Sequence, residues 1–171
     1  MNILFYCPFN FNIKSSNLKS LGGIESLNLQ LSKILSQSHY KIFLATYCEK
    51  TIRQKNLTNI PINFLLKNKS NFNFDKIISS NDPTIFNHFR YSENFLWLHN
   101  KLPIEKALRK KKFFSIIRNR ISAIFVSNYL LKKTTNIYNF KKKIVIPNFL
   151  DPIFSRIKLQ INRKPYFIWS V

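Results

Sequence analysis

The sequence predicts a doubly wound α/β fold with a mostly parallel sheet. Short apolar segments bounded by polar or turn residues recur along the chain and are typical of strands buried on both faces. Segments with helical spacing of apolar residues alternate with them, which favours parallel strands joined by helices. In open sheets of this kind ligands bind beyond the carboxyl ends of the strands, so residues that follow a predicted strand are the first candidates for function.

The first part of the chain contains a complete strand–helix–strand unit. Ile3–Tyr6 is a continuous apolar segment ended by Pro8, and Lys41–Thr46 is the next such segment. Between them, five apolar positions fall on one helical face: Ile24, Leu27, Leu31, Ile34 and Leu35. This order predicts a βαβ unit with two parallel strands.

The alternation continues through the middle of the chain. Further strands are expected at Ile62–Leu66, Asp75–Ser79, Phe95–Leu98, Ser122–Val126 and Ile144–Ile146. One helix is expected from Pro103 to Asn119, with proline in its first turn. Another is expected to run to Tyr138, capped by Ser127 or Asn128.

The last part of the chain predicts a domain boundary. Residues 1–155 are expected to form one domain. Asp151–Lys164 is polar and linker-like, and Tyr166–Val171 is a new apolar strand. Residues 156–171 are therefore interpreted as a linker and the first strand of a second, missing domain.

The chain is strongly basic, with 28 Lys and Arg residues against 7 Asp and Glu residues and a net charge of +21. Such a balance favours attraction to nucleic acid, anionic lipid headgroups or phosphorylated substrates. A codon bias toward Lys, Asn, Ile and Phe explains the same composition without any function. Cys7 and Cys48 lack metal-ligand spacing and indicate reduced thiols, and no apolar segment is long enough to span a bilayer.

Two adjacent glycines form the first candidate site. Gly22 and Gly23 are the only glycines in the chain, and they lie between the first strand and the first helix. Glycine lets a ligand approach the backbone closely, and the amino end of a helix presents unpaired N–H groups and the positive end of its dipole. Together these features predict a phosphate site. A plain strand-to-helix turn explains the same pair.

His99 is the second candidate, because it directly follows the predicted strand Phe95–Leu98. At the carboxyl end of a strand, a histidine can orient or deprotonate a hydroxyl group of a substrate. A histidine whose ring is satisfied by backbone partners at the strand end is the alternative.

A basic segment with interleaved Phe and Ile is the third candidate. Its cations are Arg109, Lys110, Lys111, Lys112, Arg118 and Arg120. This pattern suits a helix that lies on an anionic membrane surface. It also suits an ordinary amphipathic helix with a solvated basic face. Nucleic acid is a third option, although no recognisable binding module surrounds the segment.

The order of these motifs resembles the retaining glycosyltransferases of family 4. The resemblance begins with the apolar first strand, Gly22-Gly23-Ile24-Glu25 opening a helix, and His39 before the second strand. Ser122–Leu130 is similar to the family's strand that carries a serine just before a helix. Lys143–Asp151 followed by Phe154 is similar to its Val-Ile-Pro-Asn segment, and Lys164–Ile168 resembles the entry into its second domain.

The resemblance implies one half of a GT-B fold, in which two Rossmann-like domains enclose a cleft. Family members transfer a hexose from a nucleotide-sugar to a lipid or polysaccharide acceptor, without a cofactor or metal. By resemblance, Gly22 and Gly23 meet the donor phosphates, and His99 lies by the reacting sugar. Glu25 lies at the matching helix start near the cleft and, with Asn100 and Ser127, is placed on the acceptor side.

Three departures from the family pattern bear on activity. Ser38 and Phe149 stand where the family usually has glycine. The paired glutamates of the family's second domain, spaced Glu-x7-Glu, have no counterpart here. We therefore expect a truncated or split product that is inactive in isolation or is completed by a second chain.

The function implied is cell-envelope or lipopolysaccharide assembly, in the cytoplasm or at the inner face of the cytoplasmic membrane. Two alternatives remain open at this point. The first is a basic nucleic-acid-binding module. Charge is the only observation in its favour, so nucleic acid is an unlikely partner. An inactive α/β remnant would fold poorly, because Tyr166–Val171 would expose an apolar strand.

Overall fold

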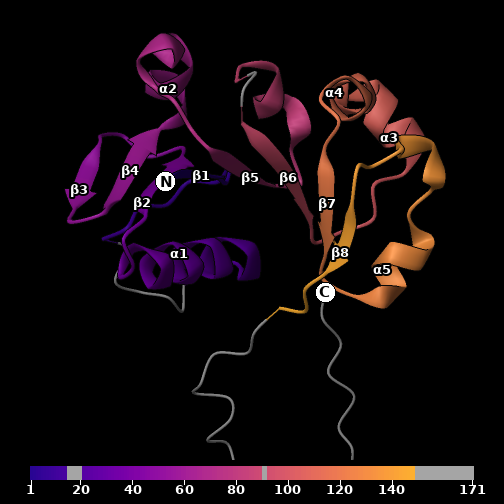
Figure 1. Ribbon diagram of the computed structural model, residues 1–171, viewed down its shortest axis with the longest axis horizontal. Coiled ribbons are helices and arrows are strands. Elements are labelled where there is room, and N and C mark those ends of the chain that lie inside the picture. Colours follow the sequence, from indigo (N-terminus) through magenta and orange to yellow (C-terminus); the bar gives the residue numbers. More distant parts are fainter. Residues whose placement is uncertain (15–20, 90–91, 149–171) are drawn as a thin grey trace, which may run out of the picture.

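A computed structural model describes residues 1–14, 21–89 and 92–148, which form an α/β domain around one eight-stranded sheet (Figure 1). The strand order is β3-β4-β2-β1-β5-β6-β7-β8. All neighbouring strands are parallel except β3 and β4. The strands are β1 Asn2–Tyr6, β2 Lys41–Thr46, β3 Ile52–Gln54, β4 Leu57–Pro61, β5 Lys76–Ser80, β6 Glu93–Leu98, β7 Ser122–Phe125 and β8 Lys143–Val145.

Helices lie on both faces of the sheet, so the predicted doubly wound, Rossmann-like fold class is confirmed. In Figure 1, α1 lies below the sheet, whereas α2, α3 and α4 lie above it. The α-helices are α1 Gly23–Ser36, α2 Ile62–Lys67, α3 Ile104–Arg109, α4 Lys112–Arg118 and α5 Asn128–Lys133. Short 3-10 helices are η2 Lys69–Asn71, η3 Pro83–Asn87 and η4 Asn136–Tyr138.

The central strand β1 contributes to two hydrophobic cores, one on each face of the sheet. Ile3 and Phe5 belong to the core beneath α1, and Leu4 and Tyr6 belong to the core on the opposite face. All four side chains are at most 5% exposed. Burial on both faces explains why this strand reads as a continuous apolar segment in the sequence rather than as an alternating one.

The strand expected at Ile62–Leu66 is wrong, because these residues begin helix α2. Ile62 and Leu65 are buried while Phe64 is half exposed, which is the spacing of a helix rather than a strand. The strand lies just before it, as β4, and ends at Pro61, whose missing N–H ends the ladder. The antiparallel strand β3, which pairs with β4, has no expected counterpart.

The single helix expected from Pro103 to Asn119 is two helices, α3 and α4. Lys111 separates them in the left-handed conformation, with φ 55° and ψ 15°. The turn lets α3 bury Ala107 and α4 bury Ser115 and Ile116. The last expected helix is also shorter, because α5 ends at Lys133 and η4 follows. The expected linker and strand over residues 156–171 lie outside the described residues.

A buried polar cluster holds the loop after β1 against β2 and β4. Asn59 in β4 is fully buried; its Oδ1 accepts a hydrogen bond from the Ile13 backbone N–H at 3.1 Å. Its Nδ2 donates to the Leu44 carbonyl at 2.8 Å and to Thr46 Oγ1 at 3.0 Å. The Thr46 hydroxyl donates to the Phe11 carbonyl at 2.7 Å. These bonds anchor the chain that leads from β1 to the paired glycines.

We expect Asn59→Leu to lower the free energy of unfolding by about 3 kcal/mol, because it leaves a buried N–H and a buried carbonyl without a partner. Urea unfolding followed by circular dichroism measures the change. The control is Asn63→Leu at an exposed position of α2, where we expect a change within about 0.5 kcal/mol. Equal effects of the two substitutions would contradict this role of Asn59.

Candidate functional site

The amino end of α1 lies at the carboxyl edge of the sheet, where the sequence predicts the site. Asn28 of α1 donates through Nδ2 to the Ser80 hydroxyl at 2.9 Å, and Ser80 is the last residue of β5. The helix begins at Gly23, roughly 7 Å further along its axis toward its amino end. The paired glycines therefore lie beside the ends of β1 and β5, at the edge where open α/β sheets bind their ligands.

Neither glycine is required by the fold of the chain. No described glycine has a positive φ, and Gly22 adopts φ −65° and ψ 165°, which any residue can adopt. A Cβ added at Gly23 would meet nothing within 4 Å, and one at Gly22 would meet only the movable carboxylate of Glu25. Both residues are exposed. Among the described residues, only the Glu25 carboxylate lies in front of this helix end.

Glu25 lies in the first turn of α1 and folds back over Gly22. Its carboxylate is stabilised by the positive end of the helix dipole. The same carboxylate acts on Cys7, directly after β1: burial first, and the negative charge of Glu25 second, raise the pKa of the Cys7 thiol. Cys7 is fully buried and remains protonated, so it has no nucleophilic role here.

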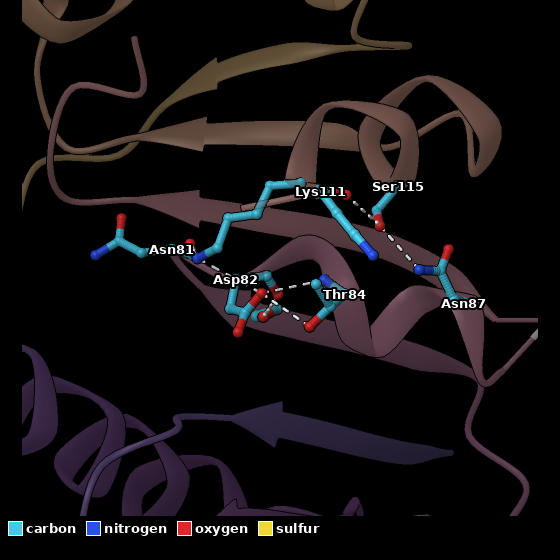
Figure 2. Close-up of polar contacts among 8 residues, drawn as sticks. Asn81, Asp82, Thr84, Asn87, Lys111 and Ser115 are labelled. Carbon is cyan, nitrogen blue, oxygen red and sulfur yellow. Dashed lines mark hydrogen bonds and ion pairs between the residues drawn. The ribbon is translucent and has the colours of Figure 1, made fainter. Parts of the chain in front are cut away.

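Asn81 joins the ends of two strands to helix α4. It adopts a left-handed conformation with φ 58° directly after β5. Its backbone N–H donates to the Trp97 carbonyl at 3.0 Å, and its Oδ1 accepts from the His99 N–H at 2.9 Å, so it binds β6 on both sides of the strand end. Its carbonyl accepts from Lys112 Nζ at 2.9 Å (Figure 2).

Asp82 continues this polar cluster and caps η3. Its Oδ1 accepts from the Thr84 N–H at 3.2 Å and from the Thr84 hydroxyl at 2.9 Å (Figure 2). The same Oδ1 lies 3.5 Å from Lys112 Nζ, in an ion pair whose side chains are 21% and 18% exposed. Lys112 is therefore engaged at the sheet edge rather than free on the outer surface of α4.

A second set of polar contacts fixes η3 to α4. Asn87 Nδ2 donates to the Ser115 hydroxyl at 2.8 Å, as Figure 2 shows. Asn119 Nδ2 donates to Asn87 Oδ1 at 2.9 Å and to the Ser115 carbonyl at 2.7 Å. These contacts hold α4 in place behind the Lys112–Asp82 pair.

The rings of His99 and Trp97 pack against each other at the end of β6, with centroids 4.6 Å apart and planes tilted by 43°. His99 Nε2 and Trp97 Nε1 are buried, and neither has a hydrogen-bond partner among the described residues. Burial lowers the pKa of His99 to about 4, so the imidazole is neutral at pH 7. A neutral imidazole can accept or donate a hydrogen bond, but Nε2 is enclosed and is not open to an incoming group.

The other acceptor-side candidates, Asn100 and Ser127, differ in whether their side chains already have a structural role. Asn100 is exposed and lines a small pocket with Asn81. Ser127 caps α5, because its hydroxyl oxygen accepts from the Leu130 N–H at 3.1 Å. This capping role, expected from the sequence, accounts for Ser127 without a ligand.

The basic segment forms a surface that also carries apolar side chains. Arg109, Lys110, Lys111, Arg118 and Arg120 are exposed. Leu108 is 44% exposed, Phe114 66% and Ile117 47%, although all are large and apolar. We call these eight residues the α3–α4 surface. No helix within the described ranges is long and apolar enough to cross a membrane.

Sequence reasoning missed Asn81, Asp82 and Trp97. The signal was present, because a buried strand is followed directly by Ser80, Asn81, Asp82 and Pro83, a polar cluster typical of a strand end that serves a site. Over the described part of the chain, no group of three or more His, Cys, Asp or Glu residues is placed to hold a metal ion.

The fold and its edge define an α/β domain of the doubly wound, Rossmann-like class. No protein-family model matches the chain, and no curated protein matches it either. The functional argument therefore rests on the geometry of the carboxyl edge.

We expect NMR titration of the imidazole signals to give His99 a pKa of about 4, below its ordinary value of 6.5, with His99→Gln used for assignment. The unfolded chain then binds the proton more readily than the folded one. Stability contributed at this position is therefore present above pH 6.5 and is lost as the pH falls toward 4. Unfolding measured from pH 7 to 4 should show a smaller loss in His99→Gln. A His99 pKa near 6.5 would contradict the buried, unpaired ring.

Proposed function

We propose that the described domain is the acceptor-side half of a two-domain glycosyltransferase. One observation carries the proposal: the only two glycines in the chain stand exposed at the amino end of α1, at the carboxyl edge, and neither backbone conformation nor packing requires them. Glycine is accepted at a helix N-cap, the position of Gly22, and it also lets a ligand approach the backbone closely. A phosphate group is the ligand that a helix amino end favours.

The neighbouring groups fit the transfer of a sugar. A diphosphate bound at α1 would receive backbone N–H donors and the positive end of the dipole, which stabilise the negative charge that grows on a departing diphosphate. His99, whose imidazole is neutral at pH 7, would orient a sugar hydroxyl bound at the end of β6. Glu25 would turn away from Gly22, because its carboxylate occupies the place of the anion.

The proposal requires a second domain, supplied by the same or another chain. Retaining transfer needs donor and acceptor to be clamped together, and the described residues supply only one wall of such a cleft. The acceptor would be a lipid-borne or polysaccharide sugar, and the donor a nucleotide-sugar. No metal or cofactor enters this scheme.

Binding of a nucleoside diphosphate tests the proposal. We expect UDP, or GDP or ADP in a panel, to shift the backbone amide signals of Gly22, Gly23 and Glu25 in ¹H–¹⁵N NMR spectra of the 171-residue chain. Gly23→Val should weaken binding at least tenfold, because the side chain fills the approach to the N–H groups.

The matched control is Ser38→Val, an exposed position just beyond the other end of α1, which should bind within twofold of the wild type. Equal binding by Gly23→Val and the wild type, or shifts confined to residues far from α1, would overturn the proposed phosphate site.

We also propose that the α3–α4 surface docks the domain on an anionic membrane. Exposed Phe114 and Ile117 lie among five exposed cations, and such a combination gains from both apolar insertion and attraction to acidic headgroups. Cations alone would leave the exposure of two large apolar side chains unexplained.

In vesicle sedimentation, we expect the chain to bind vesicles that contain phosphatidylglycerol and to dissociate from them as the salt concentration rises. We expect no binding to vesicles of pure phosphatidylcholine. Replacing Phe114 and Ile117 together by Asn should weaken binding at least fivefold. The control replaces Ile34 and Tyr47, which are 54% and 50% exposed on other elements, by Asn. If the control weakens binding as much, the α3–α4 surface is not the contact.

A further inference from the structure

The small pocket lined by Asn81 and Asn100 lies at the same edge of the sheet, between the end of β6 and helices α3 and α4. Its volume is about 130 Å³, too small for a nucleotide or a sugar ring with its neighbours. Four lysines line it, namely Lys101, Lys106, Lys110 and Lys112, together with the amides of Asn81 and Asn100. No carboxylate is among the lining residues.

The positive charge of this pocket is largely unbalanced. Asp82 pairs with Lys112 at 3.5 Å. Within the described ranges, no carboxylate lies within ion-pair distance of Lys101, Lys106 or Lys110. Glu105, next to Lys106 on α3, lines a neighbouring hollow instead. Lys106 and Lys110 therefore bring positive charge to the pocket that no described carboxylate pairs with, and this charge attracts an anion.

The fold brings these lysines to one pocket from the loop after β6, from α3 and its C-terminal end, and from α4. Lys106 lies in α3 and Lys110 is the C-cap of the same helix, where its N–H donates to the Lys106 carbonyl at 3.1 Å, so the two are neighbours one turn apart. The left-handed turn at Lys111 reverses the chain and returns Lys112 to the Asn81 carbonyl. Lys101, from the loop after β6, lies over the Tyr129 ring at 5.2 Å.

We infer that this pocket binds a phosphate group, as a monoester or diphosphate. Lysine ammonium groups bind phosphate as mobile point charges, and the two asparagine amides add neutral N–H donors. The assignment of this phosphate to the sugar acceptor rests on the proposed function. The binding of phosphate by the pocket does not, because residues of α3 and α4 line the pocket, whereas the paired glycines begin α1, and Figure 1 shows these helices on opposite faces of the sheet.

The test uses inorganic pyrophosphate and the 171-residue chain, followed by NMR signals of the lysine side chains and backbone. We expect shifts at Lys106, Lys110 and Lys112, and affinity that falls with salt. Replacing Lys106 and Lys110 together by Gln should weaken binding at least tenfold, whereas replacing both by Arg should keep it within threefold. A thermal melt confirms that each variant is folded.

The matched control replaces Lys132 and Lys141, exposed lysines outside the pocket, by Gln and removes the same charge. It should change the affinity less than twofold. Equal loss in the control, or wild-type shifts that map outside the pocket, would show only general attraction to a basic chain and overturn the inference. The wild-type map alone decides the matter if the Gln variant does not fold.

A further comparison identifies the source of the phosphate. We titrate the chain separately with soluble short-chain phosphatidic acid and with a hexose 1-phosphate. Tighter binding of phosphatidic acid indicates a lipid-borne phosphate, and tighter binding of the hexose 1-phosphate indicates a glycan-borne one. Gly23→Val should leave these shifts intact. In the wild-type chain, pocket shifts without nucleotide binding at Gly22 and Gly23 would reject the proposed function alone. Nucleotide binding without pocket shifts would reject the pocket alone.

Discussion

The left-handed backbone of Asn81 is the constraint on which the functional edge depends. A residue other than glycine in this conformation costs about 1 kcal/mol, and asparagine is among the residues that tolerate it best. In return, the Asn81 N–H binds Trp97 in β6, and its Oδ1 binds His99 directly after β6. Its carbonyl binds Lys112 in α4. Without that conformation, the three groups could not converge on one residue.

The two proposed anion sites differ in the kind of positive charge they offer. On the α1 side, backbone N–H groups and a helix dipole supply weak, directional positive charge at the glycines. On the α3–α4 side, lysine side chains supply full charges that are mobile and sensitive to salt. His99 directly follows β6, beside the α3–α4 side of the edge.

The sequence predicted most of the sheet, because strands buried on both faces leave an unbroken apolar signal. The strand Lys41–Thr46 was predicted to the residue, and the sheet's other parallel strands, β4 excepted, to within two. Ile62–Leu66 was misassigned because a short apolar segment has no period that separates strand from helix. His99 could be predicted because it directly follows a strand. Asn81 could not, because its role depends on a positive φ and on backbone contacts that no sequence pattern reveals. The break at Lys111 escaped prediction for the same reason.

The short strand β3 has a consequence for how the chain behaves at high concentration. A parallel sheet that ended at β4 would present a straight row of unpaired backbone groups to other copies. Instead a hairpin with Lys55 at φ 46° adds three residues in the opposite direction, and Arg53 and Gln54 are exposed there. A short edge strand that carries an exposed arginine is a poor template for pairing with a strand of another copy. Strand β3 therefore disfavours self-association and fibre growth at this edge of the sheet.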